Sequence, residues 1–261
     1  MPFSAQAVAH GFRYPRPPAS PKSGDAPIDG ALPGLELPRW KRFLDLAVIS
    51  LTWFIWFPLM LLLMLAIKIV SPGPVFYRQA RIGLRRKIFM IYKFRSMKAN
   101  AETRLHEAHL ERLMNEECPM TKLDAAGDPR LIPLGRLLRA SGLDELPQLF
   151  NVLRGEMSLV GPRPCTPHEF QRYQSWQRER TEVLPGMTGY WQVSGKNKTT
   201  FNEMIAMDIS YVRRMSLCGD LVIIAKTLPA MVSQCRESWQ SRPANRNNRK
   251  LFQGAGNAED I

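Results

Sequence analysis

The feature that decides the fold is an apolar stretch, FLDLAVISLTWFIWFPLMLLLMLAIKIV, at residues 43–70. Within it, the 22 residues from Leu46 to Ile67 carry no charged side chain. A straight α-helix of that length measures about 33 Å, which is enough to cross a hydrocarbon core of about 30 Å. The simplest interpretation of this stretch is therefore a single transmembrane helix.

Two features of the stretch favour a different path through the membrane. Pro58 lies near its middle, where it removes a backbone hydrogen bond and bends the helix. Basic residues also flank both ends, with Lys41 and Arg42 before the stretch and a basic run that begins at Lys68 after it. Because Lys and Arg mark the cytoplasmic side of a membrane segment, we expect a re-entrant helix-hairpin broken at Pro58, with both ends in the cytoplasm. For Asp45 two roles stay open: an ion pair with Arg42, or an ordinary charge at the membrane interface.

Composition sets the class of partner. The 261 residues include 36 Lys and Arg against 23 Asp and Glu, so the net charge is +13. Such an excess indicates a partner rich in negative charge, such as nucleic acid, anionic lipid or a phosphate-bearing substrate, and the apolar stretch favours the membrane among these. The four cysteines include no CxxC pair, and the four histidines no HExxH motif, so neither a zinc site nor a disulfide framework is indicated.

The chain divides into four parts by composition. Residues 1–38 are rich in Pro and Gly and are expected to be a disordered tail. Residues 39–72 hold the membrane helix, residues 73–235 the expected catalytic domain, and residues 236–261 a loose polar tail.

Within the catalytic domain the patterns predict one small hairpin and several short helices. Val75 to Gln79 and Lys87 to Phe94 alternate as strands do, and Gly83 lies at the bend between them. The expected helices are 100–117, 132–140, 145–153 and 201–215. The run at 221–234 is apolar and suits either a core helix or a helix in the membrane interface.

The residues best suited to chemistry cluster in GRLLRASGLDELPQLFNVLRGEMSLVGPRP, at residues 135–164. Asp144 and Glu145 are adjacent, just before a helix start marked by Pro147. An isolated acidic pair in this position is more often a helix cap than a catalytic group. Here, however, basic and amide side chains surround the pair in sequence, which favours a phosphate site.

The polar side chains around the acidic pair are those that bind phosphate. Arg139 precedes Asp144 by five residues, Gln148 follows it by four, and the Gly-Pro-Arg-Pro turn presents Arg163. Guanidinium groups match phosphate oxygens bidentately, and a nearby carboxylate can bind a divalent ion or attack phosphorus. Lys93 suits a phosphate contact or a basic face against anionic lipid equally well.

With these motifs the sequence resembles the bacterial sugar transferase family, whose members are monotopic polyprenyl-phosphate phosphoglycosyl transferases. The likeness rests on KRFLD, SPGPVFYRQARIG, YKFRSM, LDELPQLFNVLRGEMSLVGPRP, LPGMTGYWQVSGKN and MDISYVRRMSLCGDLVII, in this order over about residues 39–233. The resemblance implies that Asp144 is the nucleophile that attacks the sugar-linked phosphate of a UDP-sugar. It implies that Glu145 is the partner acid that helps to hold Mg²⁺.

The resemblance implies that Arg139, Gln148 and Arg163 lie near the phosphates and that Asp208 is a further recurrent acid. Together with Lys93 they are the expected substrate-binding residues. Two departures from the family pattern are visible. The family's membrane helix often breaks at Ser-Pro, whereas Phe57 precedes Pro58 here. Just before the acidic pair, Ala140-Ser141-Gly142 stands in place of the commoner Thr-Ser, and Gly142 is expected to loosen that turn.

The sequence as a whole predicts a helix-rich α/β enzyme that combines a re-entrant membrane helix-hairpin, a compact cytoplasmic catalytic domain with a small β-hairpin, and interfacial amphipathic helices. By resemblance, it is a magnesium-dependent sugar-phosphate transferase on the cytoplasmic face of the bacterial inner membrane. It would move a sugar phosphate from a UDP-sugar to undecaprenyl phosphate and release UMP, as the first membrane step of exopolysaccharide or related glycan biosynthesis. Anionic membrane lipids are expected partners. Downstream glycosyltransferases and a homo-oligomer are partners that the sequence allows but does not identify.

Two interpretations from other classes compete with this one. A non-catalytic membrane scaffold for glycan assembly would have no need of an acidic pair among arginines. A membrane-tethered nucleic-acid binder would need a recognisable motif or a concentrated basic patch, and the sequence has neither, so nucleic acid is not an expected partner.

Overall fold

The computed structural model describes residues 37–98, 110–114, 116, 118–120, 130–195 and 199–240, the last four by their backbone alone. The expected tails at 1–38 and 236–261 lie almost wholly outside this part of the chain, as does most of the expected helix at 100–117. In chain order the elements are α1 (Arg39–Val70), β1 (Phe76–Ile82), η1 (Leu84–Arg86), β2 (Ile88–Phe94), α3 (Gly135–Ser141), η3 (Leu143–Glu145), α4 (Gln148–Leu153), β3 (Ser158–Val160), α5 (Pro167–Gln171), η4 (Ser175–Thr181), β4 (Gly186–Thr188), α6 (Tyr190–Ser194), α7 (Phe201–Arg214) and α8 (Leu217–Gln240), where η marks a 3-10 helix.

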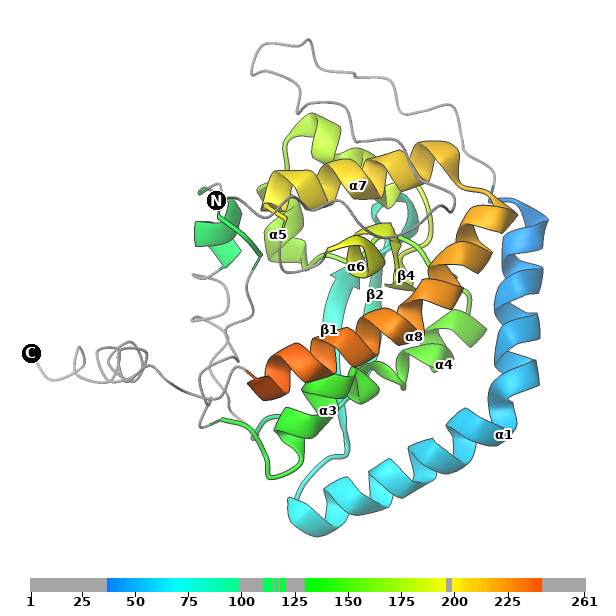
Figure 1. The fold of residues 1–261 in the computed structure, drawn as a ribbon. Coiled ribbons are helices and arrows are strands. Elements are labelled where there is room, and N and C mark those ends of the chain that lie inside the picture. Colours follow the sequence, from blue (N-terminus) through cyan, green and yellow to red (C-terminus); the bar gives the residue numbers. More distant parts are fainter. Residues whose placement is uncertain are drawn as a thin grey trace, which may run out of the picture.

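Helix α1 is bent near its middle into two arms (Figure 1). Pro58 lies inside the helix, where it lacks the N–H that would bond to the carbonyl four residues earlier. Ile49 in the first arm and Met60 and Ile67 in the second arm are buried in hydrophobic clusters of the same domain. Both arms therefore pack on one domain through one face of the helix.

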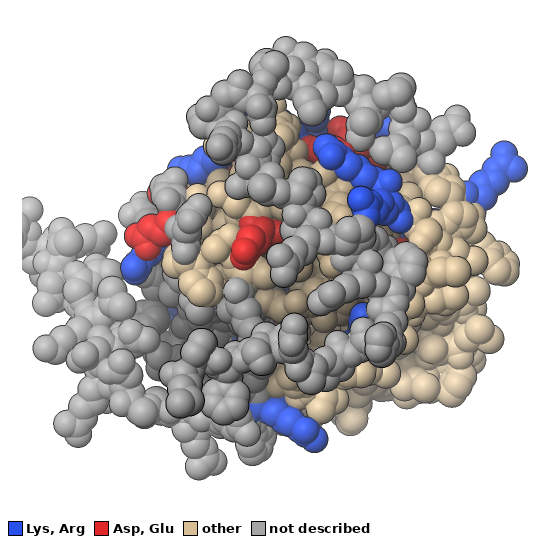
Figure 2. Space-filling view, turned by 45° about the horizontal axis from the view of Figure 1, so that its top comes forward, with Lys and Arg blue, Asp and Glu red and all other residues tan. Residues whose placement is uncertain are grey.

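The opposite face of α1 is exposed and apolar. Its exposed large side chains are Phe43, Leu46, Leu51, Trp53, Phe54, Ile55, Phe57, Leu61, Leu62, Leu65 and Ile69. In the space-filling view an extended area without charged side chains covers the lower right-hand part of the molecule, and α1 lies on the right in Figure 1 (Figure 2). By length and composition α1 and the segment Leu217–Arg236 of α8 could each cross a membrane.

Strands β1 and β2 form the antiparallel hairpin that the sequence predicts. The register runs from Phe76 opposite Phe94 to Ile82 opposite Ile88, and η1 makes the turn. Asn151 of α4 completes the other side of β2: its amide nitrogen donates to the Met90 carbonyl at 2.8 Å, and its amide oxygen accepts from Tyr92 N at 3.1 Å. Because α4 follows the acidic pair directly, this contact fixes the pair beside β2.

Three glycines let two loops approach backbone to backbone. A Cβ on Gly161 would lie 2.4 Å from the Leu184 carbonyl oxygen, and one on Gly186 would lie 2.1 Å from Gly161 N. A Cβ on Gly189 would lie 2.3 Å from the Gly161 carbonyl oxygen. Such distances exclude any side chain. The Gly-Pro-Arg-Pro turn is therefore held tightly against the loop around β4, which pairs with β3 in parallel.

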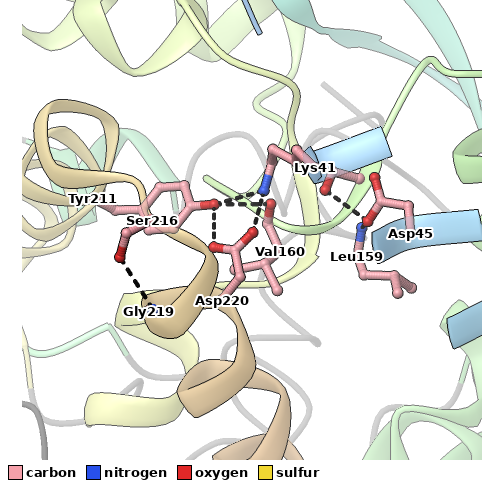
Figure 3. A network of polar contacts seen from close by, with 9 residues as sticks. Lys41, Asp45, Leu159, Val160, Tyr211, Ser216, Gly219 and Asp220 are labelled. Atoms are coloured by element: carbon pink, nitrogen blue, oxygen red, sulfur yellow. Dashed lines mark hydrogen bonds and ion pairs between the residues drawn. The ribbon is translucent and has the colours of Figure 1, made fainter. Parts of the chain in front are cut away.

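A buried polar network connects the start of α1 to α7 and α8 (Figure 3). Lys41 Nζ lies 2.6 Å from Asp220 Oδ2 and donates to the Tyr211 hydroxyl at 2.8 Å, and that hydroxyl donates to Asp220 Oδ1 at 2.8 Å. All three side chains are almost fully buried. Lys41 is thus an internal ion-pair partner of α8, and its ammonium does not lie on the outer surface where lipid headgroups would meet it.

The ion pair considered for Asp45 and Arg42 is not formed. Asp45 is buried, and its carboxylate accepts hydrogen bonds from Ser158 Oγ at 3.0 Å and Leu159 N at 2.8 Å (Figure 3). Arg42 instead donates to the carbonyls of Val152 and Leu153 at the end of α4. These two side chains therefore join the start of α1 to β3 and to the end of α4.

The run at 221–234 lies in helix α8, which is buried on one face and exposed on another. Asp220 and Ile223 are buried, while Leu217, Leu221 and Leu228 are exposed. The helix therefore has one face in the domain and one apolar face outward. It also continues to Gln240, five residues past the expected domain boundary at 235.

Candidate functional site

The acidic pair lies in a tight helical turn between two short helices. Gly142 ends α3 in the left-handed conformation, at φ 71°, and η3 follows with Asp144 and Glu145. Residues with a side chain rarely adopt this φ, so glycine suits the position. The structure thereby corrects the expectation that Gly142 loosens the turn, because its backbone freedom is what allows the turn to form.

A cavity of about 900 Å³ lies over the acidic pair. Its charged lining includes Lys93, Arg95, Arg139, Asp144, Glu145, Arg163 and Arg180. Its apolar lining includes Leu143, Leu146, Ile224, Leu228 and Met231. The cavity thus combines a cationic region around two carboxylates with an apolar wall from α8 and η3.

Glu145 is held by two cations. Lys93 Nζ lies 2.7 Å from Glu145 Oε1, and Arg163 Nη1 lies 3.6 Å from the same oxygen. Burial lowers the pKa of Lys93, and the Glu145 carboxylate opposes that shift. Of the two roles left open for Lys93, the structure favours the one at the site, since its ammonium lies inside the cavity.

Asp144 is the more buried member of the pair, with 7% of its surface exposed. It lines the same cavity as Glu145 and Arg139. Gln148 is 2% exposed and lines a small adjoining cavity that also contacts Glu145 and Arg163. The structure therefore brings together Lys93, Arg139, Asp144, Glu145 and Arg163 around one cavity and places Gln148 directly beside it.

Asp208 lies behind the cavity. Its carboxylate is 2.5 Å from Arg180 Nη2, and the two side chains are each 3% exposed. Burial raises the pKa of Asp208 to about 6, although Arg180 acts in the opposite direction. Asp208 does not line the cavity, whereas Arg180 does. The structure thus places Asp208 one residue away from the substrate space, in contact with a cation of the wall.

Two buried arginines that the sequence motifs did not single out hold the Gly-Pro-Arg-Pro turn. Arg180 Nη2 donates to the Arg163 carbonyl at 2.8 Å, and Arg81 Nη1 donates to the Pro164 carbonyl at 2.9 Å. Arg81 lies within the motif SPGPVFYRQARIG but was given no role there, and Arg180 lies outside the quoted motifs. Their burial is the only signal, and it is visible only in three dimensions.

The carboxylates of the site can supply only part of the coordination shell of Mg²⁺. Within the described ranges no group of three or more His, Cys, Asp or Glu side chains is close enough to hold a metal ion. Mg²⁺ commonly binds through one or two carboxylates and completes its shell with water and substrate phosphates. Asp144 and Glu145 fit that mode, and they do not fit a site built from protein ligands alone.

Comparison with known proteins gives a consistent result. The profile of the family described as bacterial sugar transferase matches residues 37–234. The exopolysaccharide production protein ExoY of Rhizobium meliloti is 40% identical over 192 residues, which cover 73% of this chain and 84% of ExoY.

Two further relatives carry names that state an activity. The UDP-glucose:undecaprenyl-phosphate glucose-1-phosphate transferase of Caulobacter vibrioides is 39% identical over 212 residues, 78% of this chain and 74% of that protein. The undecaprenyl-phosphate galactose phosphotransferase of Salmonella typhimurium is 39% identical over 191 residues, 72% of this chain but only 39% of that longer protein. Profile, relatives and the cavity around the acidic pair agree, and this chain belongs to the bacterial sugar transferase family.

Proposed function

We propose that this enzyme transfers a sugar 1-phosphate from a UDP-sugar to undecaprenyl phosphate and releases UMP. The observation that carries the proposal is the cavity in which Asp144 and Glu145 meet Lys93, Arg139 and Arg163. Three cations around two carboxylates suit a diphosphate, because its charge must be offset before a carboxylate can approach it. The printed names of two relatives, both undecaprenyl-phosphate sugar phosphotransferases, support the acceptor.

The proposed reaction has two displacements at phosphorus. In the first, a carboxylate oxygen of Asp144 attacks the sugar-linked phosphorus, the bond to the bridging oxygen of the diphosphate breaks, and UMP leaves with that oxygen. In the second, a phosphate oxygen of undecaprenyl phosphate attacks the same phosphorus and the bond to Asp144 breaks. The products are undecaprenyl diphosphate sugar and the free carboxylate, and the kinetics are ping-pong.

Glu145 would hold Mg²⁺ together with the substrate diphosphate, which leaves the Asp144 carboxylate to attack phosphorus. Bound there, the ion would offset negative charge on the phosphates. Lys93 and Arg163 keep Glu145 at the cavity wall, so its carboxylate stays beside the phosphates. Arg139 adds a cation on the α3 side of the cavity.

We further propose that α1 enters and leaves the membrane on one side. Its first turns bind the catalytic domain through Lys41 and Asp45, and its last turn packs Ile67 on the same domain. A helix that crossed the bilayer would place its two ends on opposite sides, which one domain could not contact. The outward apolar face of the bent helix would lie in the lipid, with the active site at the cytoplasmic surface.

The proposal is tested by UMP release from purified protein in nanodiscs with undecaprenyl phosphate, Mg²⁺ and a panel of UDP-sugars. The panel is needed because relatives of equal identity are named for glucose and for galactose. We expect release with at least one sugar, and its loss in Asp144→Asn but not in the exposed control Glu116→Gln. Absence of release with every sugar from folded wild-type protein would contradict the proposal.

A further inference from the structure

The direction of the Arg163 side chain depends on the position of its backbone. Arg163 lies between Pro162 and Pro164, whose nitrogens carry no hydrogen, so the turn has few backbone donors of its own. Its guanidinium is 35% exposed and reaches Glu145 at 3.6 Å across the cavity. A partly exposed arginine of this kind is aimed by its backbone, and the groups that hold that backbone decide its direction.

Two guanidinium groups hold consecutive carbonyls of this turn from behind. Arg180 donates to the Arg163 carbonyl at 2.8 Å, and Arg81 donates to the Pro164 carbonyl at 2.9 Å. Both donors are buried, with 4% and 7% of their surfaces exposed. Because charged donors form stronger hydrogen bonds than neutral ones, the turn is fixed at the residue that faces Glu145.

Arg180 is itself fixed on its other sides. Its Nη1 donates to the Tyr173 hydroxyl at 2.7 Å, and its Nη2 lies 2.5 Å from Asp208 Oδ2. Both terminal nitrogens of Arg180 are therefore committed to protein partners, although the side chain lines the cavity wall. Three of the five N–H donors of Arg180 are used in these contacts, so the protein fixes its position and its contact with the Arg163 carbonyl links it to the substrate side of the turn.

We propose that Arg180, held by Asp208, is a positioning residue that aims Arg163 at the phosphates of the nucleotide sugar. The inference rests on the proposed function and adds a role for two residues behind the cavity. It predicts that the position of Arg163 depends on the hydrogen bond from Arg180, and that Asp208 acts only by holding Arg180 in place.

The test separates positioning from plain stability by replacing the whole buried pair. Arg180→Met alone leaves Asp208 as an unpaired buried carboxylate and is expected to destabilise the fold, whereas the double variant Arg180→Met/Asp208→Leu replaces the pair by apolar groups, which proteins often tolerate. We expect the double variant to melt near the wild type but to show kcat/KM for UMP release reduced by about tenfold or more, since small displacements of positioning groups have effects of this size. Wild-type activity in a stable double variant would overturn the proposal.

A mutant cycle shows whether the effect passes through Arg163. Arg163→Met is expected to lower kcat/KM strongly, and adding Arg180→Met/Asp208→Leu should then lower it no further, because residues that act through one another are not additive. Full additivity would overturn the proposal. Arg178→Met, on the same 3-10 helix with its guanidinium over the Phe170 ring, is the control and should stay near the wild type.

UDP affinity measured by calorimetry gives a second readout that needs no turnover. Both Arg163→Met and the double variant should weaken UDP binding, again without additivity, and unchanged affinity in the double variant would overturn the inference. Wild-type protein that binds UDP but releases no UMP would contradict the proposed function instead, so the two failures are distinguishable.

Discussion

At the scale of single residues, Asp144 and Glu145 are neighbours in sequence but differ in their surroundings. Asp144 is 7% exposed at the cavity wall, while Glu145 is tied to Lys93 and Arg163. This difference in surroundings suits a division of roles in which Asp144 attacks phosphorus and Glu145 holds the cation beside the phosphates. Its basis is local, since the 3-10 turn that begins after Gly142 carries both residues.

Lys93→Met should lower kcat/KM for UMP release by about tenfold or more, because hydrogen bonds between charged groups contribute about 1.5–3 kcal/mol. The variant removes the ion pair between Lys93 and Glu145 and takes one cation out of the cavity. The measurement is steady-state kinetics with the preferred UDP-sugar. Lys87→Met, at the exposed end of the hairpin turn, is the control, and equal activities of the two variants would contradict the role assigned to Lys93.

Cys165 follows the Gly-Pro-Arg-Pro turn, and burial raises the pKa of its thiol to about 11. The reactive thiolate therefore forms only as the pH rises toward that value, well above the pKa of an ordinary thiol. At pH 8 we expect maleimide to modify the exposed Cys218 and to leave Cys165 unmodified, as read by peptide mass spectrometry. Rapid modification of Cys165 in folded protein at pH 8 would show that the turn opens to solvent.

The sequence predicted the residues that carry motifs and missed those that act by packing. Asp144, Glu145 and Arg163 could be predicted as site residues because their spacing resembles a family pattern. Arg81 lies in a quoted motif and Arg180 does not, but the contacts of both could not be predicted, since their partners lie 83 and 17 residues away along the chain. Burial of a charged side chain is a property of the folded state, and no local sequence pattern predicts it.

At the scale of elements, alternation predicted the hairpin of β1 and β2 correctly, because each strand has its own local pattern. The pairing of β3 with β4 was missed, since each has three residues and the contact depends on glycines that let the backbones meet. The role of Gly142 was misjudged for a related reason: glycine in a sequence indicates freedom, and only the fold shows that a left-handed φ is required there.

Gly142→Ala should cost about 1 kcal/mol of unfolding free energy, the order expected for a side chain in the left-handed region. Gly155 is a matched control, with φ 76° and open space around its Cα, so Gly155→Ala should cost a similar amount. Only Gly142→Ala should also lower turnover, because it distorts the turn that carries the acidic pair. Denaturant unfolding and UMP release measured on both variants decide this, and equal turnover would contradict the assignment.

At the scale of the whole molecule, the bent α1 and the catalytic domain form one unit. The sequence predicted a break at Pro58 from proline chemistry and flanking charge. It could not show that Lys41 is buried against Asp220 and that Asp45 binds β3. These contacts mean that α1 is part of the scaffold behind the site, since β3 leads directly into the Gly-Pro-Arg-Pro turn.

The proposed one-sided topology predicts that both ends of α1 face the cytoplasm. Single cysteines in place of Arg39 and Pro72, in a background without native cysteines, should both resist a membrane-impermeant maleimide in intact cells with a permeabilised outer membrane. Both should react once the inner membrane is opened. Labelling of one end alone from outside would indicate a spanning helix and contradict the re-entrant path.

In the proposed reaction, Asp144 carries the phosphosugar from the donor to the acceptor. The most direct measurement is the intact mass of the protein after incubation with its UDP-sugar and Mg²⁺ but without undecaprenyl phosphate. We expect a mass increase equal to one sugar phosphate less one water, located on Asp144, absent in Asp144→Asn and removed when undecaprenyl phosphate is added. Turnover by wild-type protein with no such adduct, or an adduct that persists in Asp144→Asn, would contradict it.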